Sequence, residues 1–313
     1  MNPFKLPEFL PLARYRFVFH LYDDLILPPY SASTLRGIFG HSLRKIACMT
    51  KQKTCENCPL IATCPYIRIF ANTENPSLNA SQKNTPPQAY IIEAEFNGKR
   101  FYQQGENYSF NIVLIGNISN HLALIAFAFN QAFRRGVGKN RNRGKLINIQ
   151  HEINGSWQDI YIAGKISEHE AVIKLPKTYN KHQHLHFETP VRLQEKGKIL
   201  GKDNINSTSL LKQLLRRFSA LMRLYISELD FQYQDLINKA EVITAKAENL
   251  SWFDWARYSN RQQQEMKLGG VLGDFYFYDL PPEFSQILYL GQYFHIGKET
   301  VFGLGKYSLT DIE

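Results

Sequence analysis

The chain has 313 residues, and 37 Lys and Arg against 28 Asp and Glu give it a formal net charge of +9 with His neutral. Hydrophobic residues make up 44% and charged residues 21%, which excludes wholesale disorder and a collagen-like or coiled-coil fibre. The longest apolar stretch, residues 122–129, is too short for a bilayer span, and early prolines interrupt any secretory signal. We therefore expect a cytoplasmic protein of two domains, without a membrane partner, whose excess positive charge favours a polyanionic ligand although it also serves solubility.

The first half of the chain alternates predicted strands and helices. Apolar and polar residues alternate over residues 14–23, which predicts a half-buried strand. After a Pro-Pro turn, a helix capped by Ser33 or Thr34 is expected, with its apolar and polar residues fully segregated. A cysteine-bearing insertion follows, and then strands near 89–96 and 108–116, a helix near 120–133 and a strand near 145–153.

The second half shows the same order of elements. It offers a strand through 184–193, a helix over about 207–227, strands within 240–278, a helix over about 282–294 and a strand near 304–309. Each half is thus predicted to contain a strand, a helix, two strands, a helix and a strand. This is the βαββαβ order of a ferredoxin-like fold. The sequence thus predicts an α+β protein with two tandem ferredoxin-like (RRM-like) domains. Their predicted bounds are residues 1–155, with a small cysteine-rich metal-binding insertion at 48–66, and residues 156–313, with a Gly-rich loop at 291–306.

All four cysteines of the chain fall within 17 residues, at Cys48, Cys55, Cys58 and Cys64. Disulfides are disfavoured in the cytoplasm, and four thiolates at this spacing suit tetrahedral coordination of zinc. A four-cysteine site leaves no open position for a substrate, so the predicted zinc is structural. An iron–sulfur cluster, and thiols that are unliganded or oxidised, stay open as alternatives.

Residues 134–145 hold six basic side chains and no acidic one. One guanidinium group can donate two hydrogen bonds to the oxygens of one phosphate, and the interspersed glycines allow the backbone to approach a ligand. A solvated loop tip is the alternative, but such loops rarely concentrate one sign of charge. The pattern favours phosphate binding by Arg134, Arg135, Lys139, Arg141, Arg143 and Lys145.

Three further patterns have a structural and a functional interpretation. The Gly-rich stretch 290–307 is a structural turn or an anion-binding nest of backbone amides. The helix over 207–227 carries Lys212, Arg216, Arg217 and Arg223 on a face that is either solvated or a second phosphate-binding surface. His182, His184 and His186 could hold a metal, although simple alternation along an exposed strand explains them better.

The first predicted helix presents His41 on its polar side, with Lys45 one turn later. Gly37 and Gly40 share this polar side, where they lower helix propensity without serving a core. Close approach of another backbone or of a ligand is a simple reason to keep them.

Taken in order, several of these segments resemble the CRISPR-associated endoribonucleases that process precursor CRISPR RNA, members of the RAMP (repeat-associated mysterious protein) superfamily. The segments are LRGIFGHSLR at 35–44, the cysteine cluster ending Cys-Pro-Tyr, the GVGK and RNRG stretches of residues 134–145, FETPVRL at 187–193, GGVLG at 269–273 and the Gly-rich end of the chain. The resemblance extends from about residue 14 to residue 309.

The resemblance implies two tandem ferredoxin-like domains and cleavage of CRISPR repeat RNA without a catalytic metal. It implies His41 as general base, Lys45 and Arg44 neutralising the phosphate, and Tyr30 orienting it, with His295 and Lys298 as a competing pair. The expected RNA-binding residues are Arg36, Arg44, the six basic residues of 134–145, Arg216, Arg217, Lys298, Gly303 and Gly305.

The leading hypothesis is therefore an endoribonuclease acting on precursor crRNA. Because the same superfamily supplies such scaffolds, the alternative is a non-cleaving RNA-binding subunit of a CRISPR effector complex. A zinc-dependent DNA-binding protein is a third, weaker hypothesis.

Overall fold

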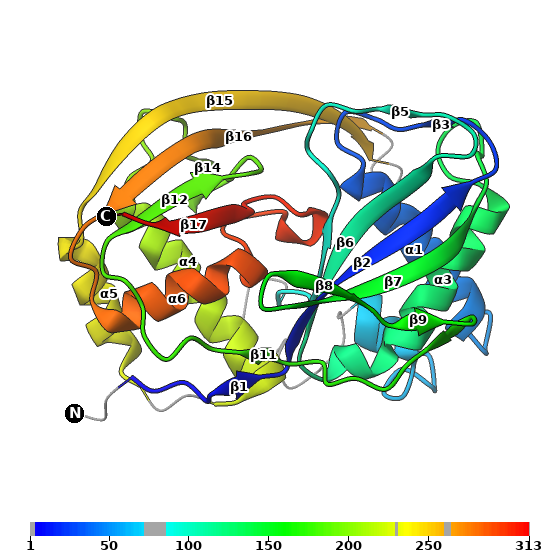
Figure 1. Ribbon diagram of the computed structural model, residues 1–313, viewed down its shortest axis with the longest axis horizontal. Helices are drawn as coiled ribbons and strands as arrows, with labels where there is room; N and C mark the ends of the chain where they lie inside the picture. The colour runs from blue at the N-terminus through cyan, green and yellow to red at the C-terminus, as the bar shows by residue number, and fades with distance from the viewer. Residues whose placement is uncertain (1–3, 72–85, 229–230, 260–263, 313) are drawn as a thin grey trace. The chain divides into compact units, whose positions relative to one another are not determined.

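The computed structural model describes residues 4–71, 86–228, 231–259 and 264–312 (Figure 1). The chain forms two compact units, which we call the first unit, Pro11–Ile173, and the second unit, Lys174–Glu313 with Met1–Leu10. The chain passes between them at β1 (Phe9–Leu10) and β11 (Ile173–Lys174). Within the described residues, no helix has the length and apolar character needed to cross a membrane.

The first unit is built on a five-stranded antiparallel sheet in the order β4-β6-β2-β7-β8. Two helices, α1 and α3, pack against each other on one side of this sheet (Figure 1). The elements are β2 (Leu12–Leu21), α1 (Ala32–Ala47), β4 (Tyr90–Glu93), β6 (Asn107–Ile115), α3 (Leu122–Arg135), β7 (Gly144–Ile153) and β8 (Ser156–Asp159). Short strands and short helical turns complete the first unit: β3 (Leu25–Ile26), η1 (Ile67–Ala71), β5 (Phe101–Tyr102), η2 (Gly116–His121), β9 (Tyr161–Ile162) and β10 (Lys165–Ile166).

An aromatic cluster fills the space between this sheet and its helices. Phe39 of α1 and Phe129 of α3 stack at 4.7 Å between ring centroids and 7° between planes. Phe129 also contacts Phe110 of β6 at 4.9 Å, and Phe17 of β2 at 5.7 Å. Because Phe129 touches both the other helix and two strands, it joins the layers of the unit.

The first helix differs in two details from the sequence prediction. It begins at Ala32, and neither Ser33 nor Thr34 is its N-cap; that position is Ser31, whose side chain makes no capping hydrogen bond. Gly40 is buried, since a Cβ added there would lie 2.2 Å from the Phe70 ring. Glycine at this position thus admits an aromatic side chain of the same unit. Gly37, in contrast, is exposed with nothing within 4 Å of an added Cβ.

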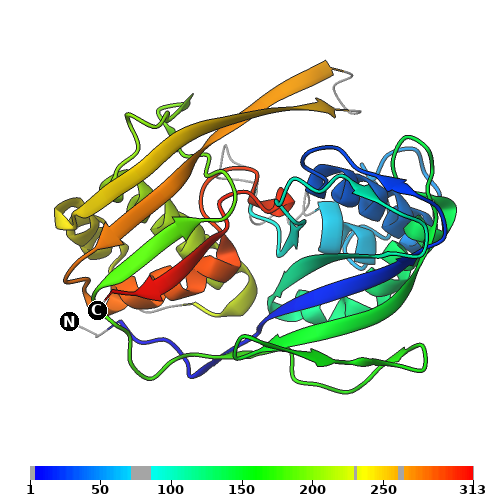
Figure 2. The same cartoon turned by 45° about the horizontal axis from the view of Figure 1, so that its top comes forward.

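The second unit contains a four-stranded antiparallel sheet in the order β15-β16-β12-β17. Its helices lie on one side of the sheet (Figure 2). The elements are β12 (Gln183–Phe187), α4 (Ser207–Leu221) with its continuation η3 (Met222–Ile226), α5 (Tyr233–Val242), β15 (Ala245–Ser259), β16 (Gln264–Phe277), α6 (Pro282–Phe294) and β17 (Tyr307–Asp311). Shorter elements are β13 (Gln194–Glu195), β14 (Lys198–Ile199) and η4 (Thr300–Phe302).

The predicted helices over 207–227 and 282–294 correspond closely to α4 with η3 and to α6. A reciprocal capping box, in which Asn206 accepts from the Ser209 amide and the Ser209 hydroxyl accepts from the Asn206 amide, starts α4. The sequence analysis missed α5, whose weak apolar stripe buries only Leu236 and Ala240. It also placed a boundary at residue 155, whereas β8 pairs with β7, so that the first unit extends to Ile173.

Replacing Phe129 by Ala should lower the free energy of unfolding of the first unit by about 3–5 kcal/mol, because the change empties a site that two layers share. Phe127→Ala on the same helix is the matched control. Its side chain is exposed (48%), so this change should stay within about 0.5 kcal/mol. Urea unfolding followed by circular dichroism measures both values, and equal losses in the two variants would contradict the assigned core.

Candidate functional site

Helix α1 presents a histidine and a lysine to solvent on one face. His41 and Lys45 are both exposed and lie four residues apart, so their side chains are neighbours on the helix surface. Among the described residues no hydrogen bond to the His41 ring is found, so the ring is accessible for proton transfer. The arrangement places a proton acceptor beside a positive charge.

The two arginines of α1 already make contacts within the first unit. Arg44 donates from Nη2 to the carbonyl oxygens of Gln52 (2.8 Å) and Lys53 (2.7 Å). The Arg36 guanidinium lies 4.5 Å from the centroid of the Phe70 ring, and its Nη2 is 3.5 Å from Gln88 Oε1. Both side chains therefore hold neighbouring loops in place, a role that the sequence did not suggest.

Tyr30 lies in the core of the first unit. Its side chain is 4% exposed, and its ring packs edge-on against Phe96. Burial raises the pKa of its hydroxyl well above the ordinary value, with a smaller contribution from Glu93. The expected role of Tyr30 in orienting a phosphate is not supported, because its side chain has almost no surface to offer a ligand.

Residues 134–145, which we call the basic hairpin, run from the end of α3 through a small closed turn to the start of β7. Val137 and Asn142 exchange backbone hydrogen bonds of 2.8 and 3.0 Å, and the Arg141 amide donates to the Gly138 carbonyl. Val137 is fully buried and anchors the turn. Gly136 has a φ of +105°, and a Cβ there would lie 2.2 Å from the Arg141 carbonyl oxygen, so this position requires glycine.

All six basic side chains of the hairpin are exposed, as the sequence predicted for a phosphate-binding loop. Arg143 alone pairs with a carboxylate in the part of the chain that the structure describes, through Asp23 at 3.0 Å. Hydrogen bonds from Arg143 lower the pKa of Asp23. Of the remaining five, Arg134 and Arg135 end α3, Lys145 lies in β7, and Lys139 and Arg141 extend from the closed turn between them.

The Gly-rich loop of the second unit is packed inward. His295 is 0% exposed and its Nδ1 lies 3.2 Å from the Leu304 carbonyl oxygen. The amides of Gly303 and Gly305 donate to the carbonyls of Thr300 and Pro190. Burial argues against His295 as a base at the surface, and the two glycine amides are not available as an anion nest. Lys298 does remain exposed.

The two arginines of α4 differ in their surroundings. Arg217 donates from Nε to the Phe294 carbonyl oxygen at 2.5 Å, and burial lowers its pKa to about 10. Arg217 thus joins α4 to the end of α6, a structural role beside the RNA-binding role predicted from the sequence. Arg216 is exposed and retains that expected role.

The four cysteines line a single pocket of the insertion, together with residues such as Met49, Thr50 and Tyr66. All are half-buried free thiols, and the Thr50 hydroxyl lies 3.6 Å from the Cys58 sulfur. Their sulfurs are not clustered within 4.8 Å in groups of three or more. The shared pocket is compatible with the spacing of the four cysteines, and the expected zinc stays a prediction.

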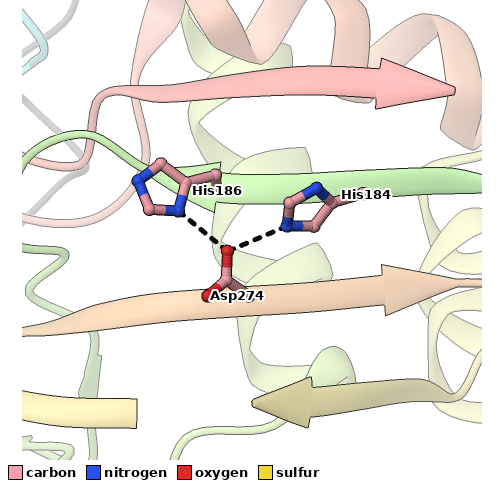
Figure 3. Close-up of side chains that lie close together, drawn as sticks. All are labelled: His184, His186 and Asp274. Atoms are coloured by element: carbon pink, nitrogen blue, oxygen red, sulfur yellow. Dashed lines mark hydrogen bonds and ion pairs between the residues drawn. The ribbon is translucent and has the colours of Figure 1, made fainter. Parts of the chain in front are cut away.

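One group of three metal-ligand atoms within 4.8 Å of one another exists among the described residues, and it lies elsewhere. His184 and His186 of β12 both point to Asp274 of β16 (Figure 3). His182 is not part of this group; its Nδ1 lies near the Asp279 amide. From the sequence, a metal site of the three histidines is one interpretation, but strand alternation is favoured. Asp274 was missed because the pairing of β12 with β16 brings it in from 88 residues away.

Two family models match the chain. The model of the AF_1859_N N-terminal domain covers residues 10–174, and the model of CRISPR-associated endoribonuclease Cas6 covers residues 185–307. The match over residues 185–307 makes the second unit similar to the Cas6 endoribonucleases. The two matches divide the chain nearly where its two compact units meet.

Solved structures of Cas6 proteins share the fold. A Cas6 product complex aligns with 96% of this chain and 100% of its own at 12% identity and a TM-score of 0.58. Thermus thermophilus Cas6 aligns with 97% and 100% at 11% identity and a TM-score of 0.53. A RAMP protein binding different RNA substrates aligns with 96% and 100% at 13% identity and a TM-score of 0.51. The comparison with curated protein sequences returned no match.

Gly136→Ala should loosen the basic hairpin, because the added Cβ collides with the Arg141 carbonyl. Strain of about 1–2 kcal/mol would raise the fraction of molecules with an open hairpin about 5- to 30-fold. The initial rate of trypsin cleavage within the hairpin should rise by the same factor. Gly155→Ala is the control, since Gly155 also has a positive φ but nothing lies within 4 Å of an added Cβ. An unchanged cleavage rate within residues 134–145 of Gly136→Ala would contradict the closed turn.

Proposed function

We propose that this protein binds CRISPR repeat RNA and cuts precursor crRNA once per repeat, using the RNA's own 2′-hydroxyl and no catalytic metal. The observation that carries the proposal is the exposed pair of His41 and Lys45 on α1 in a chain whose second unit matches an endoribonuclease family. The products would be a 2′,3′-cyclic phosphate and a 5′-hydroxyl end.

We also infer that both units are ferredoxin-like domains. The four main strands of each unit can be numbered 1 to 4 in chain order. In the sheet they then lie side by side in the order 2-3-1-4 in both units. All pairings in this set are antiparallel, with two helices packed on one face. This order agrees with a βαββαβ unit.

In the proposed reaction the protein forms no covalent bond with the RNA. His41 takes the proton from the 2′-hydroxyl, and the 2′-oxygen attacks the adjacent phosphorus while the bond to the 5′-oxygen breaks. The departing 5′-oxygen takes up a proton from water. Lys45 stabilises the charge that develops on the phosphate oxygens, and binding of the flanking strand aligns the attack.

The basic hairpin binds the RNA backbone. Its exposed side chains offer phosphate contacts that do not depend on base sequence. Arg216 and Lys298, both exposed, add positive charge on the second unit. Arg36, Arg44 and Arg217 also act through the loops and helix ends that they hold.

Cleavage of labelled repeat RNA in EDTA tests this function. Wild-type protein should leave cyclic-phosphate ends, and a single 2′-deoxy residue at the cut site should abolish cleavage while binding persists. His41→Ala should slow cleavage about 100- to 10,000-fold at unchanged RNA affinity, since it removes a general base. His182→Ala is the control and should cleave normally.

Each alternative predicts a different result in this assay. A non-cleaving subunit of an effector complex would shift RNA mobility and leave the strand intact. Cleavage of the 2′-deoxy substrate, or cleavage only after a divalent ion is added, would contradict the proposed chemistry. A DNA-binding protein would treat the ribose and deoxyribose strands alike.

We propose further that the cysteine pocket holds a structural zinc ion through Cys48, Cys55, Cys58 and Cys64. The donor set fits, because four thiols of one loop line one pocket. In a tetrahedral zinc site the sulfurs lie about 3.8 Å apart, so binding must draw the cysteine side chains together. The ion would connect the segments of an insertion that buries few apolar side chains.

Metal analysis of protein purified without added zinc tests this site. The Cys55→Ser, Cys58→Ser double variant should contain one zinc fewer per chain than wild type, and its remaining thiols should react with a thiol reagent without prior chelation. Thr54→Ser in the same loop should retain the wild-type zinc content. Iron with a visible absorbance band would point to a cluster, and four reactive thiols in untreated wild-type protein would contradict a bound metal.

A further inference from the structure

The histidine pair of β12 and Asp274 of β16 lie together on the second unit, and the proposed cleavage uses none of the three residues. His184 Nε2 and His186 Nδ1 each lie 2.8 Å from Asp274 Oδ1. Figure 3 shows the two rings approaching the same carboxylate oxygen from either side along the strand. Three side chains that bind metals well therefore aim at one point.

Strand geometry places these side chains on the sheet face opposite the helices. Residues two apart on a strand share a face, and Leu185 and Phe187, on the other face, are buried. His186 lies directly opposite Asp274 in the β12–β16 register, and His184 lies opposite Tyr276. The ligand positions thus belong to paired strands of a rigid sheet.

Neighbouring side chains hold each ligand in orientation. His184 Nδ1 lies 3.2 Å from the Thr310 hydroxyl, and its ring stacks on Tyr276 at 4.4 Å and 6°. Asn249 Nδ2 donates to Asp274 Oδ2 at 3.2 Å, leaving Oδ1 for the histidines. Outer hydrogen bonds of this kind fix the tautomer of a ligating histidine and the rotation of a ligating carboxylate.

We propose that His184, His186 and Asp274 form a binding site for a divalent transition metal of the zinc class. Two imidazoles and one carboxylate favour such ions over Mg²⁺ or Ca²⁺, which prefer oxygen ligands throughout. In a tetrahedral zinc site the ligand atoms lie about 3.4 Å apart, so the 2.8 Å contacts need open by only about half an ångström.

The charges and exposure around the site are compatible with a bound cation. Glu248 of β15 lies opposite Asp274 in the strand register, adding a second carboxylate, while Lys246 pairs with Glu248. The His186 side chain is 53% exposed, so at least one coordination position remains open to water. The ion would connect β12 to β16 and would take no part in the cleavage proposed above.

Titration of the whole metal-free protein with Co²⁺ tests this proposal, because cobalt bound by thiolates gives a charge-transfer band that cobalt bound by nitrogen and oxygen lacks. We expect two classes of site, one of them without that band. His186→Gln and Asp274→Asn should each weaken the second class by at least about 100-fold, more than the loss of an outer partner costs. Thr310→Val should weaken it about 10-fold.

His182→Gln is the matched control, since His182 lies two residues from His184 but outside the group, and it should bind cobalt as wild type does. Nitrogen-15 spectra of the imidazoles supply a direct readout: Zn²⁺ should shift the signals of His184 and His186 and leave that of His182. Thermal unfolding of the metal-free variants checks that they fold. Cobalt binding only to thiolates, or histidine signals that zinc does not move, would overturn the proposal.

Discussion

Each unit of this protein buries one face of an antiparallel sheet beneath helices, and this one-sided burial decides which side chains can act. In the first unit, Phe17, Phe110 and Phe129 fill the space between the layers. The outward side of α1 is then left for His41 and Lys45. In the second unit, Leu185 and Phe187 of β12 are buried, so His184 and His186 between and beside them must face outward.

The same packing also brings polar side chains onto backbone carbonyl oxygens within the second unit. Arg217 satisfies the Phe294 carbonyl near the end of α6, and His295 lies against the Leu304 carbonyl. Buried carbonyl oxygens need hydrogen-bond donors, and a long basic side chain can supply one across the unit. A positive or titratable residue in a family-like motif is therefore not evidence of ligand contact until its burial is known.

The two clusters of metal-ligand side chains differ in how they are assembled. The cysteines are close in the chain and meet in a loop, where the sulfurs share a pocket without close convergence. The histidines and Asp274 are far apart in the chain and meet on a sheet, where hydrogen bonds already hold them 2.8 Å apart. A loop must be ordered when the ion binds, whereas a sheet site is ordered beforehand and loses less entropy.

Local patterns in the sequence were enough to place the main helices and strands, the exposed basic hairpin and the grouping of the cysteines. These features depend on periodicity, on turn glycines such as Gly136 and on short spacing, all of which act between near neighbours in the chain. Burial of Tyr30 and His295, the contacts of Arg44, and the meeting of Asp274 with His184 were decided only by tertiary structure. They depend on which distant segments pair and pack, and no local pattern encodes that register.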